Sequence, residues 1–388
     1  MSWSDVVMPQ VTGAVSAGAR RPGALRRAVP GPVILALALA FGACAESAPP
    51  PGDRVSAEAA EPREPRLIEQ QSGTTRRLQA LSIVNGHVVW ASGVGGTWVR
   101  TLDGGRNWEP GVVPGADSLE FRDVHAFDQD RAFLLSARSG SQSRIYRTRD
   151  GGRSWELVFV NEEPDGFYDC MDFWDDRRGA VYGDAVGGAL RALVTSDGGD
   201  TWSLVPPDHL PAALPGEGGF AASGTCLVAG PDGVGWIGTG NASPARVLRT
   251  EDAGASWAAY DTPLVAGEGA GVFSVVFRDA LHGMVLGGDL GRRGEHTANV
   301  AVTEDGGRSW RLAGTLRFPG PAYGAAWVPG PDPATVVAVG PGGADVSYDW
   351  GQTWTALSDQ EFWAVAFHSR EAGWMVGPQG RIVRVELP

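Results

Sequence analysis

The segment Thr303-Glu304-Asp305-Gly306-Gly307-Arg308-Ser309-Trp310 is one of six copies of a single motif in this chain. Every copy reads Ser/Thr-x-Asp-x-Gly-x-Asn/Ser/Thr-Trp, and the six aspartates are Asp103, Asp150, Asp197, Asp252, Asp305 and Asp349. By subtraction they are 47, 47, 55, 53 and 44 positions apart. A period of this size is typical of a repeat fold in which each copy is one supersecondary unit.

The sequence around each motif predicts four short strands. In the fifth copy these are 272–277, 283–287, 299–303 and 310–316, where apolar stretches alternate with polar turns. No window shows helical periodicity of useful length. Four-stranded antiparallel sheets repeated around a channel form a β-propeller, so the chain is predicted to be all-β.

The ends of the chain fix the number of blades. After the sixth motif, 362–367, 373–377 and 380–385 read as three strands without a fourth, and Arg66–Gln71 lies upstream of the first complete copy near Leu78. Pairing this N-terminal strand with the last blade would remove the open edge. We therefore expect a seven-bladed β-propeller over residues 66–388, closed by an N-terminal strand that completes the last blade.

The Asp motif has a structural explanation that needs no ligand. Its aspartate can accept hydrogen bonds from backbone N–H groups of its own turn, and its glycine permits a positive φ. Its tryptophan starts the outer strand and can pack between blades. Six copies around one ring also argue against catalysis, because an active site needs only one.

The motifs identify the copies as Asp-box, or BNR, repeats of the sialidase superfamily. The segments 303–310 and Gly373-Trp374-Met375-Val376-Gly377-Pro378-Gln379-Gly380 resemble most closely the photosystem II stability and assembly factor family. This resemblance covers nearly the whole chain beyond Pro65, and implies a seven-bladed, non-enzymatic binding or assembly factor. The alternative is a glycan-binding or sialidase-like glycan-hydrolysing propeller. The Arg-Ile-Pro signature of sialidases is absent, its nearest counterpart being Arg66-Leu67-Ile68.

The N-terminal region predicts export. A basic leader precedes an apolar run of about nine residues, 33–41, which is too short to span a bilayer. The following Gly42-Ala43-Cys44 resembles a bacterial lipoprotein signal. We therefore expect a signal peptide over 1–43, lipidation of Cys44, a Pro/Ala/Glu-rich disordered tether over 44–65, and a periplasmic or cell-surface location in a bacterial envelope.

Composition narrows the range of partners. A formal net charge of −13 disfavours nucleic acid and anionic headgroups, so membrane contact is expected only through the lipid. Dinucleotide, haem and hydrolase motifs are absent, so no cofactor and no catalytic residue is predicted, and a monomer is expected. Cys170 and Cys226 fall on neighbouring innermost strands. Their expected registers differ by one position on strands that alternate faces, which disfavours a disulfide.

Departures from the repeat mark a candidate ligand site on the axial face opposite the Asp-box turns. After the second strand, blades three, four and five carry Asp184, Asn241 and, one place later, Asp289, where blades one, six and seven have Val or Pro. The same sector holds Asp169 and Asp172 on an inner strand and Glu217 in the insertion 206–219. These oxygens can bind a cation, a sugar or a basic peptide segment. Alternatively, they stabilise turns and backbone groups locally.

Overall fold

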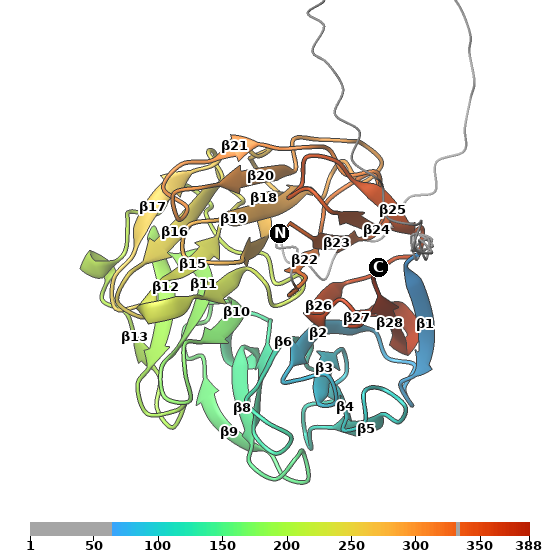
Figure 1. Ribbon diagram of the computed structural model, residues 1–388. Coiled ribbons are helices and arrows are strands. Elements are labelled where there is room, and N and C mark those ends of the chain that lie inside the picture. Colours follow the sequence, from blue (N-terminus) through green and yellow to red (C-terminus); the bar gives the residue numbers. More distant parts are fainter. Residues whose placement is uncertain (1–63, 331–333) are drawn as a thin grey trace, which may run out of the picture. The chain divides into compact units, whose positions relative to one another are not determined.

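The computed structural model describes residues 64–330 and 334–388, and these form a seven-bladed β-propeller. Figure 1 shows the blades following one another around a ring, with one strand of each blade facing the axis. The leader 1–43, Cys44 and most of the predicted tether lie outside the described residues. No helix in the described part of the chain is long and apolar enough to cross a membrane.

Each blade is a meander of four antiparallel strands, numbered from the axis outwards. Blade one comprises β2 (Leu78–Ile83), β3 (Val89–Gly93), β4 (Thr97–Thr101) and β5 (Glu109–Val112). Blade two comprises β6 (Phe121–Ala126), β7 (Ala132–Ser136), β8 (Arg144–Thr148) and β9 (Glu156–Val160). Blade three comprises β10 (Tyr168–Phe173), β11 (Gly179–Val186), β12 (Ala189–Thr195) and β13 (Ser203–Leu204). Blade four comprises β14 (Leu227–Ala229), β15 (Gly235–Gly238), β16 (Arg246–Thr250) and β17 (Ala258–Asp261). Blade five comprises β18 (Ala270–Phe277), β19 (Gly283–Asp289), β20 (Val300–Thr303) and β21 (Arg311–Leu312).

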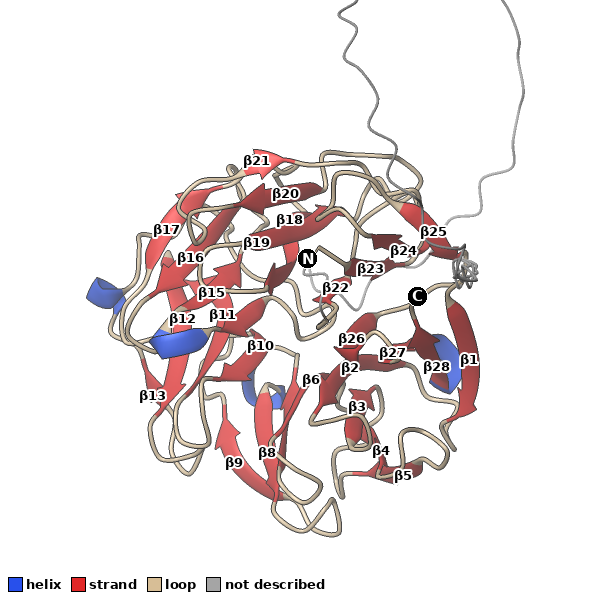
Figure 2. Ribbon diagram, viewed as in Figure 1, coloured by secondary structure: helices blue, strands red, loops and turns tan. Residues whose placement is uncertain are grey.

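Blade six comprises β22 (Gly324–Trp327), β23 (Val336–Gly340), β24 (Gly343–Ser347) and β25 (Thr355–Ser358). Blade seven comprises β26 (Ala364–Ser369), β27 (Ala372–Val376), β28 (Arg381–Glu386) and β1 (Arg66–Gln71). The described helices are four 3₁₀ turns at Gly140–Gln142, Pro207–His209, Pro231–Gly233 and Pro378–Gly380, drawn blue in Figure 2.

The predicted closure of the ring is confirmed. The N-terminal β1 pairs antiparallel with the C-terminal β28 over six residue pairs, from Arg66–Glu386 to Gln71–Arg381. Figure 1 shows them side by side, in blue and red. The Gln70 side chain then accepts hydrogen bonds from Trp108 Nε1 of blade one at 3.0 Å and Trp374 Nε1 of blade seven at 3.1 Å. The closing strand thus joins the first and last blades.

The hydrophobic core lies between the blades. Seven clusters of buried apolar residues each draw on two adjacent blades, such as Trp90 with Leu134 and Trp236 with Val285. Polar groups also join neighbouring inner strands. The Ala126 N–H donates to Ser82 Oγ, Met171 N–H to Asp123 Oδ2 and Ala325 N–H to Ser274 Oγ, at 2.6–3.0 Å.

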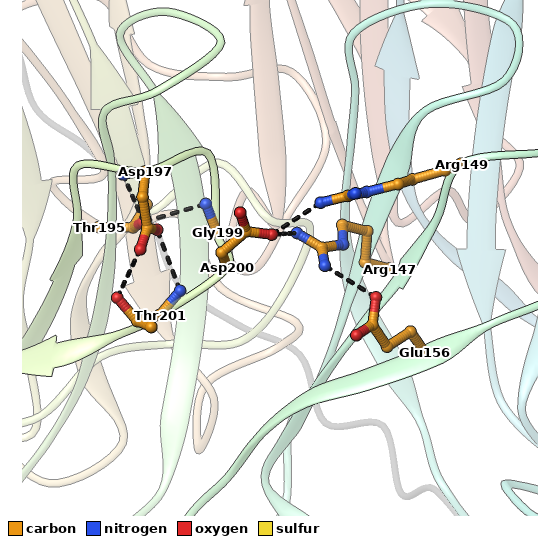
Figure 3. A network of polar contacts seen from close by, with 8 residues as sticks. All are labelled: Arg147, Arg149, Glu156, Thr195, Asp197, Gly199, Asp200 and Thr201. Carbon is orange, nitrogen blue, oxygen red and sulfur yellow. Dashed lines mark hydrogen bonds and ion pairs between the residues drawn. The ribbon is translucent and has the colours of Figure 1, made fainter.

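The Asp boxes form hairpin turns at one face of the ring. In blade three, Asp197 accepts from the Thr201 N–H at 3.0 Å and from the Thr201 hydroxyl at 2.6 Å, while Thr195 Oγ1 accepts from the Gly199 N–H (Figure 3). The other five boxes repeat this arrangement. In blade two, the hydrogen bonds from Ser154 hold the pKa of Asp150 at about 2.

Arginines tie some of these turns to the preceding blade. Arg147 on β8 donates to Asp200 in the Asp-box turn of blade three and to Glu156 on β9, and Arg149 reaches the same Asp200 oxygen (Figure 3). Arg249 on β16 similarly donates to the Gly306 carbonyl of blade five at 2.8 Å. The hydrogen bonds therefore give the Asp boxes a structural role in turns and blade contacts.

The expectation that Cys170 and Cys226 are unpaired is wrong, because they form a disulfide with Cα atoms 5.9 Å apart. A β-bulge shifts the register of β10 between Tyr168 and Cys170, and Cys226 precedes β14 rather than lying within it. The assumed alternation of faces therefore does not apply. The bridge joins blades three and four.

Removal of this disulfide should destabilise the propeller. The bridge closes a loop of 56 positions, for which the chain-entropy model gives about 4 kcal/mol. We expect the Cys170→Ala/Cys226→Ala variant to unfold at lower urea concentration, with a free energy of unfolding lower by about 2–5 kcal/mol. Reductant should destabilise the wild type and leave the variant unchanged. Equal responses of both proteins to reductant would contradict a native bridge.

Candidate functional site: the axial mouth

The face opposite the Asp boxes is built from two sets of loops. Isolated β-bridges join Val94, which follows β3, to Glu120 before β6, and Ser139, which follows β7, to Phe167 before β10. Gly240 after β15 likewise bridges to Gly271 at the start of β18. The loop between the second and third strands of each of these blades therefore meets the residues that enter the next innermost strand. This arrangement brings side chains from several blades to the axial mouth.

A short segment before β14 crosses the centre of the ring. The Ala221 carbonyl accepts from Arg122 of blade two at 3.3 Å, and the Ser223 hydroxyl donates to the Tyr323 carbonyl before blade six at 2.8 Å. Phe220 stacks on Phe273 of blade five with centroids 3.9 Å apart. A segment that reaches blades two, five and six from blade four must pass through the channel, so we call residues 220–225 the channel segment.

Small side chains allow this crossing. Ala221, Ala222 and Ser223 are at most 2% exposed, and a Cβ on Gly224 would lie 2.3 Å from Asp123 Oδ1. The sequence signal was the run of small residues after the insertion between blades three and four, but its path depends on contacts with distant blades. Because the segment occupies the axis, a bound molecule would rest on the mouth instead of threading the ring.

Arginines from blades one and two gather beside the channel segment. Arg77, Arg122 and Arg138 share one carboxylate, Glu120, at 3.7, 2.7 and 3.7 Å respectively. Burial lowers the pKa of Arg77, as does the neighbouring Arg122 charge, while Glu120 opposes the shift. This cluster was not predicted from the sequence, because its members come from three separate loops and strands.

Aromatic rings extend the arginine cluster towards blades six and seven. The Arg77 guanidinium lies 4.6 Å from the centroid of Trp363, which is 4.9 Å from the ring of Tyr323. Burial raises the pKa of Tyr323, while Arg293 from the loop between β19 and β20 lowers it and Glu361 raises it. The two rings are buried, so they fix the position of the Arg77 guanidinium at the mouth through a cation–π contact.

The predicted oxygen-bearing residues are engaged in local bonds. Asn241 adopts φ 58° and accepts from the Gly269 N–H at 3.0 Å; Asp289 accepts from the Gly291 N–H and from Arg292, both at 2.8 Å. Asp172 accepts from the Ala229 N–H at 2.8 Å and lies 3.0 Å from His125. These bonds account for the side chains as turn and blade contacts, and ligand binding by them stays a prediction.

Glu217, in the insertion 206–219, forms a buried ion pair with Arg246. Its side chain has no exposed surface and accepts from Arg246 at both carboxylate oxygens, from Thr239 at 2.8 Å and from the Leu214 N–H at 2.9 Å. Breaking such a pair leaves an uncompensated buried charge and is strongly destabilising. The geometry makes Glu217 an anchor for residues 212–218.

Asp169 and Asp184 form a buried carboxyl pair beside the channel segment. Asp184 accepts from the Gly219 N–H at 2.9 Å, and Asp169 bonds to Asp184 and to the Ala221 backbone. Burial, followed by the Asp184 charge, raises the pKa of Asp169 well above its usual range, and burial raises the pKa of Asp184 to about 6. Two carboxyls can hydrogen-bond to each other only when one of them carries a proton, and the raised pKa of Asp169 favours a proton on that residue.

This pairing is unsuited to glycoside hydrolysis. Retaining and inverting glycosidases hold two carboxyls about 5 to 9.5 Å apart across a sugar. Asp169 and Asp184 are in hydrogen-bond contact, and Asp169 is only 2% exposed. Among the described residues, no group of three or more His, Cys, Asp or Glu side chains could hold a metal ion. Asp169 and Asp184 therefore lack the geometry of a glycosidase pair.

The structure is a seven-bladed β-propeller of four-stranded antiparallel blades. No family model and no curated protein matches the chain. Among solved structures, it is similar to "YCF48 bound to D1 peptide", with 19% identity and a TM-score of 0.59, covering 85% of this chain and 99% of that one. YCF48 from Cyanidioschyzon merolae gives 17% identity and a TM-score of 0.58, covering 82% and 98% respectively.

A GH74 xyloglucanase from Xanthomonas campestris is also similar, with 16% identity and a TM-score of 0.58. The match covers 82% of this chain and 53% of the enzyme, so the chain corresponds to about half of it. These identities establish the fold alone. The predicted resemblance to YCF48-like, photosystem II assembly factor propellers is thus confirmed at the level of fold.

The carboxyl pair should make stability depend on pH. A carboxyl whose pKa is raised on folding stabilises the protein below its unfolded pKa, and this contribution is lost as pH rises through the folded pKa. Asp169→Asn keeps an N–H donor for Asp184 but cannot ionise. The free energy of unfolding of the wild type should therefore fall relative to that of the variant as pH rises from 5 to 8. We expect the difference between the two proteins to change by up to ~1.4 kcal/mol per pH unit in favour of the variant.

Urea unfolding of both proteins at four pH values would measure this difference. The Asp150→Asn variant serves as a control, because hydrogen bonds hold the pKa of Asp150 low and it does not titrate in this range. Parallel stability curves for the wild type and Asp169→Asn would contradict a shared proton.

Proposed function

We propose that this protein is a non-enzymatic binding module that holds an acidic protein segment across its axial mouth. The carrying observation is the arrangement of Arg77, Arg122 and Arg138 around the single carboxylate of Glu120. Such arginines bind carboxylates through directed hydrogen bonds. The proposal is supported by the shared fold with a YCF48 structure bound to a D1 peptide.

Charge counting favours an acidic ligand over the basic peptide considered from the sequence. Arg77, Arg122 and Arg138 share the single carboxylate of Glu120, so 3 − 1 gives this cluster a formal excess of +2. The chain as a whole carries −13. A local positive excess on an acidic protein would direct acidic partners to this face.

The shape of the mouth favours a protein segment. The channel segment supplies a floor, and the buried Trp363 and Tyr323 pack beside the arginines and hold them in place. A peptide can lie across this surface with its carboxylates over the cluster. Glycan hydrolysis would require two accessible carboxyls that stand apart on either side of the sugar. Asp169 and Asp184 are buried against each other, so they do not provide such a pair.

Binding assays would test this assignment. We expect fluorescein-labelled peptides rich in Asp and Glu to bind, with an affinity that falls as salt is added. Lysine-rich peptides and neutral or sialylated oligosaccharides should bind much more weakly. Arg77→Ala and Arg138→Ala should each weaken binding about threefold to tenfold. Arg153→Ala, an exposed change in the Asp-box turn of blade two, is the matched control.

Equal binding of acidic and lysine-rich peptides would reject the proposal, as would unchanged affinity in both mouth variants. Oligosaccharide binding that Arg77→Ala abolishes would instead favour the glycan alternative.

We also propose that the protein is exported and anchored by a lipid on Cys44. Support comes from the apolar run 33–41 followed by Gly42-Ala43-Cys44, and from the Cys170–Cys226 disulfide, since such bonds persist mainly in oxidising compartments. In a bacterial host, the wild type should incorporate an alkyne fatty acid and sediment with membranes. Cys44→Ala should lose both properties, whereas Cys170→Ala/Cys226→Ala should retain them. Membrane association of Cys44→Ala would contradict the lipid anchor.

A further inference from the structure

A second candidate binding surface lies away from the axis, between blades two and three. A groove of about 440 Å³ runs along this junction, and its wall includes Phe159, Tyr168, Leu193, Trp202, Leu204 and Arg191. We call it the interblade groove. None of its lining residues belongs to the arginine cluster or the channel segment, so it is separate from the mouth site.

The groove exposes apolar surface that folding leaves uncovered. Phe159 and Tyr168 meet edge to face with centroids 5.6 Å apart, and Trp202 meets Phe173 in the same way at 5.7 Å. Leu204 and Val160 at its edges are 46% and 36% exposed. The outer strand β13 has only two residues, which leaves part of the blade-three surface open. Exposed apolar surface rimmed by polar residues is typical of protein interaction sites.

The rim of the groove is acidic. Glu162, Glu163 and Asp165 are exposed on the loop after β9, and within residues 64–330 and 334–388 none of the three forms an ion pair. Inside, Arg191 Nε is buried without an acceptor in the described chain. The groove thus has carboxylates at its edge and the half-buried Arg191 in its wall.

We propose that the interblade groove binds an extended protein segment in which a large apolar side chain is flanked by lysine or arginine. The apolar side chain packs against Phe159, Trp202 and Leu204. The flanking cations pair with Glu162 and Glu163, and the Arg191 guanidinium donates to a backbone carbonyl of the segment. This occupant has the opposite charge to the one proposed for the mouth, so the two surfaces select different segments.

Fluorescence anisotropy with the labelled, end-blocked peptide Gly-Lys-Leu-Trp-Lys-Gly tests this site in the folded protein. We expect it to bind, while versions with Glu in place of Lys, or Ser in place of Leu and Trp, do not. Leu204→Ser should weaken binding about tenfold, and Glu163→Lys about fivefold with a smaller salt dependence. The controls are Leu312→Ser, at the same place in blade five and 49% exposed, and Glu268→Lys, an exposed carboxylate that forms no ion pair with the described residues.

Several outcomes would overturn the proposal. One is that the Glu-containing peptide binds as tightly as the Lys-containing peptide, and another is that the control variants lose as much affinity as the groove variants. A third is concentration-dependent dimerisation that Leu204→Ser abolishes, because a second copy of the chain would then be the occupant. Loss of binding in Arg77→Ala would place the peptide at the mouth. Failure at the mouth and failure at the groove are therefore distinguishable, since Arg77→Ala and Leu204→Ser report on different peptides.

Discussion

The packing of each blade against its two neighbours is the interaction on which the rest of the structure depends. A single four-stranded sheet exposes both faces, and only the adjacent blades cover them, as the seven interblade clusters show. Because an open array would leave one face and one edge uncovered, the pairing of Arg66–Gln71 with Arg381–Glu386 completes the burial for the whole ring. The Gln70 bonds to Trp108 and Trp374 join that closure to the core on both sides.

The ring also determines the chemistry of its two faces. On one face, the Asp-box aspartates are half-buried or exposed and hydrogen-bonded, and the pKa of Asp150 is held at about 2. On the other, residues from blades two to six surround the channel segment, and burial raises the pKa of Asp123, Asp169 and Asp184. Asp169 and Asp184 lie beside the channel segment, while arginines from blades one and two lie at the mouth. The acidic segment proposed as the ligand would meet these arginines.

Part of the site was accessible to sequence reasoning. Asp184, Asn241 and Asp289 were correctly recognised as departures from the repeat, because equivalent positions can be compared blade by blade. Their hydrogen bonds could not be predicted, since Gly219, Gly269 and Arg292 reach them through loops whose paths are not encoded locally. Arg77 and Arg138 were missed because an arginine in an irregular loop gives no signal until another loop places a carboxylate or an aromatic ring beside it.

The sequence by itself determined the propeller, the number of blades and the closing strand, because these follow from a local motif repeated six times and from strand counting at the two ends. Only the tertiary structure decided the Cys170–Cys226 bridge, the path of residues 220–225 and the pairing of Asp169 with Asp184. The physical reason is range: strand patterns depend on neighbours a few positions apart, whereas these contacts depend on bulges and loop paths that bring together residues from different blades.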